Sequence, residues 1–156
     1  MNTSQSTRRD LRLFAGRVLM AAVFVLSGIG KLASPYAAFR YIASFGLPAA
    51  EPALMVAMLL ELACGTLLIV GYRTRWVSSV LTAYCIVTAF IFHHAFEDPD
   101  QMFHFLKNLA MAGGLLGFTA SGAGAFSLDH FLGRISKHGA QVAELVRSPY
   151  ADNART

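Results

Sequence analysis

Charge is scarce in this sequence, and its scarcity excludes an ordinary water-soluble domain. Only 14% of the 156 residues are Asp, Glu, Lys or Arg, and 55% are hydrophobic, whereas soluble domains carry about 25% charged residues. Cysteine is also rare: Cys64 and Cys85 form no CxxC motif, and simple packing is the interpretation we favour for both. Because no basic patch is interleaved with exposed aromatic residues, no nucleic-acid partner is expected.

The apolar residues are concentrated in four long blocks, which predict four membrane-spanning helices. Crossing the hydrocarbon core of a bilayer takes about 20 residues in a helix, and each block comes close to that length. In lipid the backbone must satisfy its own hydrogen bonds, so a helix is the form expected for each block. We therefore expect one all-α integral membrane domain, a four-transmembrane-helix bundle with spans at about residues 13–32, 52–70, 76–94 and 104–121.

The first block has a second interpretation. Arg8, Arg9 and Arg12 precede an apolar run, as in a secretory signal peptide. However, Arg17 interrupts the run and no small-x-small cleavage site follows it. A retained first helix, embedded in the lipid bilayer with the three later ones, is the interpretation we favour.

The distribution of basic residues predicts the orientation. Arg73 and Arg75 lie in the short connection between the second and third spans, and further basic residues lie in both terminal segments. The positive-inside rule then places the N and C termini in the cytoplasm. We expect residues 1–10 to be a disordered tail and residues 133–156 to be a polar cytoplasmic tail, with a short interfacial helix over residues 127–134.

Two features of the remaining chain predict how the helices are arranged. In the outer loop between spans one and two, YAAFRYIASFGLP (residues 36–48) has apolar residues at helical spacing and ends in Gly46 and Pro48. A short helix on the membrane surface is favoured there over an ordinary loop. In the fourth span, Gly113 and Gly117 have GxxxG spacing, which predicts a face where helices pack closely.

Glu61 stands within the apolar sequence MLLELACG, where a carboxylate is costly unless it faces the bundle interior. At 1.5 Å per residue, Arg17 lies roughly 7 Å deeper toward the cytoplasm, within reach of a long side chain. Lys107 is the rival partner from the outer side. We expect Glu61 to be buried and either paired with a cation or protonated. The predicted polar network within the membrane comprises six ionisable or amide side chains: Arg17, Lys31, Glu61, His93, Lys107 and Asn108.

These six residues have two interpretations that the sequence leaves open. One is a structural ion-pair network that fixes which helices touch. The other is a polar pocket open to the outer face, lined by all of them except Arg17, that holds a small anion or a quinone headgroup or passes a proton. Metal binding is disfavoured, because adjacent His93 and His94 point to different helix faces. No catalytic residues are indicated, and no sequence motif for an intrinsic cofactor is present.

An ordered set of segments resembles the DoxX family of small four-helix bacterial membrane proteins. GRVLMAAVFVLSGIGKL (16–32) is similar to the family's first helix, and LELACGTLLIVGYRTRW (60–76) to its most characteristic segment. FHH (92–94), HFLKNLAMAGGLL (104–116) and SLD (127–129) follow in the expected order, and the resemblance covers about residues 11–132. It implies a multi-pass protein of the bacterial inner membrane and suggests that the six polar residues matter together.

The resemblance also suggests a redox role. Some family members or relatives are membrane subunits of thiosulfate–quinone oxidoreduction, and others are linked to thiol and oxidative-stress homeostasis. We therefore expect a redox-associated membrane subunit with an outward-facing polar pocket, a quinone as its cofactor, and redox partner proteins or a homo-oligomer around it. Two alternatives stay open. One is a non-catalytic scaffold for soluble redox enzymes, and the other is a small-solute or proton transporter.

Overall fold

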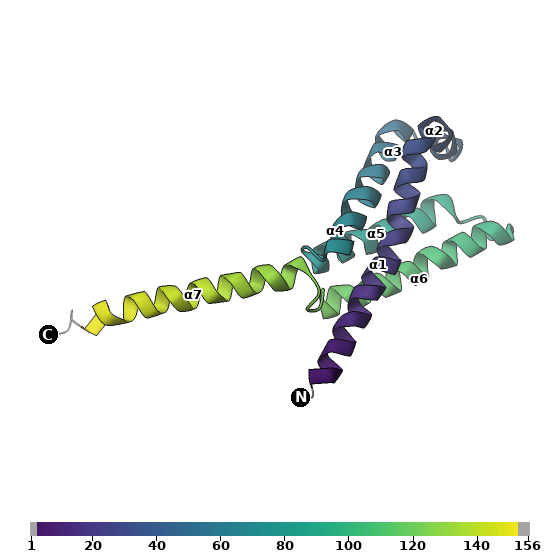
Figure 1. Ribbon diagram of the computed structural model, residues 1–156. Helices are drawn as coiled ribbons and strands as arrows, with labels where there is room; N and C mark the ends of the chain where they lie inside the picture. Colours follow the sequence, from purple (N-terminus) through teal and green to yellow (C-terminus); the bar gives the residue numbers. More distant parts are fainter. Residues whose placement is uncertain (1–2, 153–156) are drawn as a thin grey trace.

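The computed structural model describes residues 3–152, and the side chains of residues 4–144, and it is built from helices joined by short connections. In chain order the elements are α1 (Thr3–Ala33), α2 (Pro35–Ser44), α3 (Ala50–Leu59), the π-helix η1 (Leu60–Cys64), α4 (Gly65–Val70), α5 (Thr74–Phe92), α6 (Pro99–Ser121) and α7 (Leu128–Asp152) (Figure 1). No strand occurs within residues 3–152. The all-α class predicted from the sequence is confirmed.

Three helical segments are long and apolar enough to cross a membrane. They are Ser4–Ala33, Ala50–Val70 (α3, η1 and α4 in succession) and Thr74–Phe92. Large apolar side chains on their surfaces have no protein neighbours to cover them: Leu19, Leu26 and Leu59 are 73%, 68% and 67% exposed. Such a surface requires lipid. Three of the four predicted spans are thereby supported.

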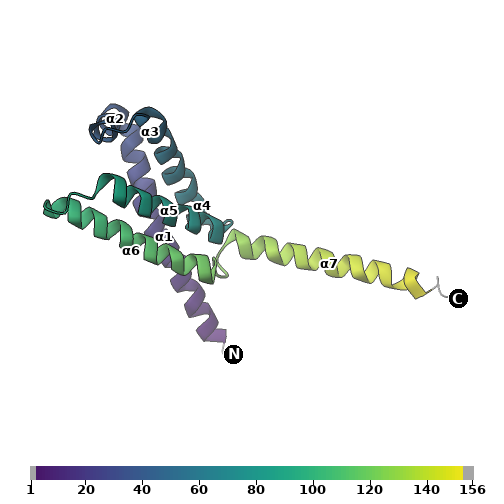
Figure 2. The same cartoon turned by 180° about the vertical axis from the view of Figure 1, so that it is seen from behind.

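The helices pack around one buried core, in which α5 and α6 form a closely packed hairpin across α1 and α4 (Figures 1 and 2). The core side chains come from all four of these helices and are Ala21, Phe24, Leu68, Val77, Leu81, Cys85, Ala112 and Leu115. Cys85 is fully buried among them and unpaired, as the packing interpretation expects. A second, smaller cluster joins α2 to α3 through Ile42, Ala50 and Leu54.

Glycines set the closest approach between the first and second candidate spans, but they are not the glycines predicted for packing. A Cβ on Gly28 would lie 2.7 Å from Leu62, and one on Gly65 would lie 2.9 Å from Val25. The GxxxG prediction is wrong, because no atom lies within 4 Å of a Cβ on Gly113 or Gly117. The buried face of α6 is formed by Asn108, Ala112, Leu115 and Phe118, so these two glycines point away from the other helices.

Both terminal segments are more helical than predicted. Helix α1 begins at Thr3, so residues 3–10 of the predicted disordered tail are helical. Residues 3–12 contain neither Gly nor Pro, and the Asp10 carboxylate accepts a hydrogen bond from the Ala125 amide, which holds this end of α1 against the loop before α7. Residues 1–2 lie outside the described residues.

Helix α7 likewise continues through the predicted polar tail as far as Asp152 and projects away from the bundle in both views (Figures 1 and 2). The predicted interfacial helix over residues 127–134 is its first part. The helix is longer than predicted because the good helix formers Gln141, Ala143 and Glu144 outweigh Gly133 and Gly139 within it.

Helix α2 confirms the short helix predicted in the loop between spans one and two. It begins with Pro35 at its first turn, where a missing amide hydrogen costs nothing. It ends at Ser44, and Gly46 follows with a φ of +72°. Ile42 on its buried side packs against α3, while Tyr36 stays 72% exposed.

At the opposite end of the bundle, Arg17 joins three parts of the chain. Its side chain is fully buried. It donates hydrogen bonds to the carbonyls of Leu68 (3.2 Å) and Ile69 (3.5 Å) near the end of α4, and to the carbonyl of Phe126 before α7. A cation that contacts the last carbonyls of a helix is favourably placed in the helix dipole. Arg17 therefore serves here as a helix cap.

Gly71 makes room for this guanidinium. It ends α4 in the left-handed conformation, with φ of +73° and ψ of +46°. A Cβ at this position would overlap the Arg17 guanidinium and come within 2.6 Å of Ser127. The carbonyl of Gly71 accepts a hydrogen bond from the Asp129 amide at 2.9 Å, and the Asp129 carboxylate accepts hydrogen bonds from the amides of Arg73 and Thr74 at the start of α5.

We expect Gly71→Ala to lower the unfolding temperature of the purified protein. The left-handed conformation alone costs a non-glycine residue about 1–2 kcal/mol, and the displaced Arg17 adds to that. Gly113→Ala is the matched control, since its Cβ meets nothing and alanine is the better helix former by about 1 kcal/mol. Thermal unfolding in mild detergent measures both. Equal unfolding temperatures for the two variants would contradict this account of the cap.

Candidate functional site

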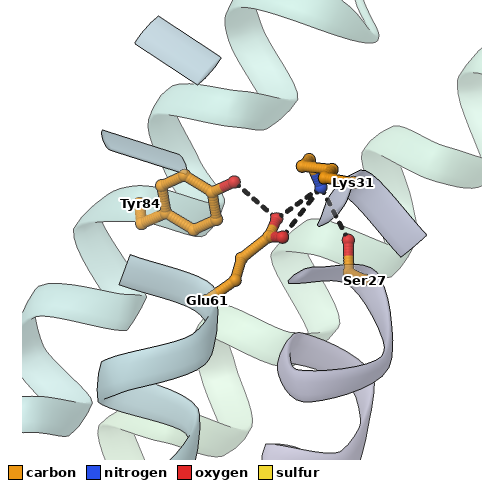
Figure 3. Close-up of polar contacts among 4 residues, drawn as sticks. All are labelled: Ser27, Lys31, Glu61 and Tyr84. Atoms are coloured by element: carbon orange, nitrogen blue, oxygen red, sulfur yellow. Dashed lines mark hydrogen bonds and ion pairs between the residues drawn. The ribbon is translucent and has the colours of Figure 1, made fainter. Parts of the chain in front are cut away.

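Glu61 lies at the centre of a polar network between the first three candidate spans (Figure 3). It is only 4% exposed. Lys31 Nζ at the end of α1 lies 2.8 Å from each carboxylate oxygen and donates as well to Ser27 Oγ at 2.8 Å. The Tyr84 hydroxyl on α5 donates to Glu61 Oε1 at 2.7 Å. The carboxylate is therefore buried and paired with a cation, as the sequence predicts.

Neither partner predicted for Glu61 is correct. Arg17 caps α4 at the other end of the bundle, and Lys107 donates to His104 Nδ1 at 3.0 Å. The depth argument put Arg17 within reach of Glu61, but the backbone carbonyls of α4 lie closer to its guanidinium. Lys31 was predicted to lie in the same pocket, but not as the partner. Its flexible stem reaches into the bundle from the helix end, so its side chain is 23% exposed while Glu61 is buried.

The backbone around Glu61 is a π-helix, Leu60–Cys64. An α-helix that contains such a turn holds one extra residue in that turn. The turn separates α3 from α4 in the middle of the span, and it brings Glu61 onto the buried side along with Ala57, Gly65 and Leu68. Turns of this kind are rare and are found frequently at functional sites.

The network forms one wall of a cavity of about 180 Å³. The structure brings five of the six predicted site residues to this cavity: Lys31, Glu61, His93, Lys107 and Asn108. Arg17 is the exception. Tyr41 and Ile42 of α2 also line it, so α2 covers this end of the bundle. Apolar lining comes from Phe24, Phe92 and Met111.

Two stacked histidines contact the cavity residues Lys107 and Asn108 or line the cavity beside them. His93, one residue past the end of α5, lies 2.9 Å from the Gln101 amide oxygen through Nδ1, and its ring stacks on that of His104 with centroids 5.1 Å apart. His104 in turn accepts from Lys107 through Nδ1 and from the Asn108 amide through its backbone carbonyl. These contacts hold Lys107 and Asn108 at the cavity.

Burial lowers the pKa of His93, and the nearby His104 and Lys107 lower it further, while the hydrogen bond to Gln101 acts in the opposite direction. The neutral ring is therefore favoured at neutral pH. With His93 neutral, Lys31 and Lys107 are the cationic groups that line the cavity and Glu61 the anionic one. This balance favours a ligand with electron-rich oxygen atoms.

An apolar groove lies next to the polar cavity, between α3 and α5. One side of it is formed by residues between Leu47 and Leu60, and the other side by residues of α5 between Val80 and Phe92. Its volume is about 680 Å³. The groove and the polar cavity have five residues in common: Ile42, Ala57, Tyr84, Thr88 and Phe92. The polar cavity and the apolar groove therefore meet at these five side chains.

Three polar participants were missed from the sequence. Ser27 and Tyr84 contact the ion pair, and Gln101 holds His93. Ser27 could have been found, since it lies one helical turn before Lys31 on the same face. Tyr84 is the only tyrosine within Thr74–Phe92, but a hydroxyl in an apolar block gives no sign of its partner.

The sequence that forms these helices and their polar network matches a known protein family. The DoxX family model matches residues 12–94, which include α1 from Arg12 onward, the π-helix with Glu61, the whole of α5, and His93 and His94. This is more than half of the chain. The chain belongs to the DoxX family.

Two curated relatives agree with this assignment. The chain is similar to the inner membrane protein YqjF of Escherichia coli strain K12, with 30% identity over 125 residues, which are 80% of this chain and 95% of YqjF. It is also similar to the inner membrane protein YphA of the same organism, with 29% identity over 126 residues, which are 78% of this chain and 90% of YphA. No solved structure matches the chain significantly. The protein described here is a DoxX-family inner-membrane protein.

We expect Lys31→Met to lower the free energy of unfolding by about 3 kcal/mol, because it leaves the Glu61 carboxylate buried without its cation. Glu61→Gln in the same chain should recover part of that loss, because the amide is neutral. A double-mutant cycle in mixed detergent micelles measures the coupling, which we expect to be about 1 kcal/mol or more. Arg40→Met on the exposed side of α2 is the charge-matched control. Additive effects of Lys31→Met and Glu61→Gln would show that the two side chains are not coupled.

Proposed function

We propose that this protein binds the headgroup of a membrane quinone in the polar cavity beside Glu61 and acts as the membrane subunit of a redox system. The observation that carries the proposal is the junction of the polar cavity with the apolar groove, which share Tyr84, Thr88 and Phe92 among their lining residues. A quinone has the matching shape, since two carbonyl oxygens lie on a compact ring that bears a long apolar tail.

The chemistry of the cavity supports a carbonyl ligand. Lys107 and Asn108 line the cavity and have N–H groups beyond their contacts with His104, whereas the N–H and O–H groups of Lys31 and Tyr84 are directed at Glu61 and Ser27. A carbonyl oxygen accepts such hydrogen bonds without bringing a full charge into the membrane. A small anion would satisfy the same donors but would leave the apolar groove without a purpose. The groove therefore favours the quinone over the anion.

The proposal includes the membrane arrangement. Helix α6 is the fourth span, with its polar first half lining the cavity and its apolar second half completing the bundle. Both termini lie in the cytoplasm, because Arg9, Arg12, Arg73 and Arg75 lie at one end of the helices. The cavity then opens at the outer half of the membrane, and a redox partner would supply or remove electrons from that side.

We expect purified wild-type protein to retain a quinone in mild detergent and Ala83→Phe to lose most of it. Ala83 lines the apolar groove and is exposed, so a phenyl ring there blocks the tail while leaving the ion pair intact. Native mass spectrometry, with quinone extraction as a second measurement, detects the retained ligand. Lys107→Met should weaken retention through the headgroup.

Ala63→Phe is the matched control for this experiment, because Ala63 is also exposed but lies on the second candidate span, on a face that does not line the groove. It should retain quinone as the wild type does. Quinone absent from the wild type, even after the pure compound is added, would refute the proposed ligand. Equal retention in Ala83→Phe and Ala63→Phe would refute the groove as its tail site.

Helix α7 favours a second candidate function, a scaffold for soluble redox enzymes. From His130 to Glu144 each residue of this helix is exposed, and the helix projects from the bundle (Figure 2), where a partner protein could bind. For this function, deletion of residues 136–156 should abolish capture of partner proteins from membranes, while Glu61→Gln should not. Quantitative mass spectrometry of the co-purified proteins measures this. Capture that survives the deletion would refute the scaffold.

A further inference from the structure

A large open groove lies at the end of the bundle opposite the polar cavity, and nothing in the proposed function uses it. Its volume is about 910 Å³. Its walls come from the first turns of α1, the connection between α4 and α5, the loop before α7 and the start of α7. We call it the Arg73 groove. Its charged, aromatic and histidine lining residues are Arg9, Asp10, Arg73, Arg75, Trp76, Asp129 and His130.

The charge of the Arg73 groove is positive in effect. Both of its carboxylates are occupied by the backbone: Asp10 accepts from the Ala125 amide, and Asp129 accepts from the amides that begin α5. Among residues 4–144 the one ion pair is Lys31–Glu61, so neither carboxylate pairs with an arginine, and three arginines against two aspartates leave the lining with a formal charge of +1. Three guanidinium groups from Arg9, Arg73 and Arg75 are left to face an open volume.

A further observation indicates where the groove lies relative to the lipid. Trp76 stands beside the arginines and is 75% exposed at the first turn of a candidate span, where tryptophan favours the boundary between headgroups and acyl chains.

We propose that the Arg73 groove binds the phosphate headgroup of an anionic phospholipid. Arginine is suited to this ligand, because its planar fork of N–H groups matches the oxygens of a phosphate. The groove lies at the ends of the candidate spans Ser4–Ala33 and Thr74–Phe92. A lipid in the surrounding leaflet can therefore place its headgroup among the arginines while its acyl chains run along the apolar faces below Trp76. Basic pockets between helices are a known form of headgroup site.

Binding of phosphatidylglycerol to the full chain in mild detergent tests the proposal, with phosphatidylcholine of the same acyl chains for comparison. Native mass spectrometry should show bound phosphatidylglycerol and much less phosphatidylcholine. The Arg73→Gln/Arg75→Gln variant should bind phosphatidylglycerol more weakly, by about fivefold for each arginine removed. Both side chains are exposed, so the variant keeps the buried core, and its unfolding temperature verifies that it is folded.

Arg134→Gln/Lys137→Gln on α7 is the matched control, because it removes the same charge outside the Arg73 groove. This control should bind phosphatidylglycerol as the wild type does. Equal weakening by the two double variants would overturn the site and indicate attraction by net charge alone. Inorganic phosphate at millimolar concentration should leave lipid binding nearly unchanged. Full displacement by inorganic phosphate would overturn the lipid as the ligand and indicate a free-anion site.

Discussion

The ion pair between Glu61 and Lys31 is the constraint on which the cavity end of this structure depends. A carboxylate in the middle of a span must be matched by a cation and by hydrogen bonds, because lipid offers neither. Meeting that requirement brings together the end of α1, the π-turn of the second span and Tyr84 of α5. The same residues then form the wall of a cavity. A stabilising contact and a binding site are here one arrangement of atoms.

The other end of the bundle meets a different polar requirement. The last carbonyls of α4 and the first amides of α5 would lack partners at the sharp turn between them. Arg17 donates hydrogen bonds to the carbonyls of α4, and Asp129 accepts hydrogen bonds from the amides of α5. The two side chains are far apart in the sequence, Arg17 on α1 and Asp129 at the start of α7, and they meet at Gly71. Its left-handed conformation and missing Cβ let the turn close around a buried guanidinium.

Much of the helical order could be predicted from the sequence, because length and hydropathy alone determine where a chain can cross a bilayer. The cavity could be predicted in outline, since Lys31, His93, Lys107 and Asn108 all lie at helix ends on one side, with Glu61 approaching from mid-span. The partner of Glu61 could not be predicted. A depth estimate treats each helix as straight and compares Cα heights, whereas the lysine stem and the π-turn decide which atoms meet.

The packing glycines were mispredicted for a related reason. GxxxG spacing identifies glycines on one helix face, but it does not say which face turns inward. In α6 the buried face is defined by Asn108 and Ala112, and Gly113 lies one position further round the helix. Gly28 and Gly65, which make the close contacts, have no such spacing to mark them. Their role depends on Leu62 and Val25 across the interface.

The π-turn has a consequence for how sequences of this family can be compared. Each residue advances an α-helix by about 100°, so the extra residue in Leu60–Cys64 fixes the rotation of α3 relative to α4. A relative one residue shorter between Ala57 and Gly65 would turn a carboxylate at the Glu61 position away from α1. Alignment gaps at this point therefore separate relatives that can build the same buried pair from relatives that cannot.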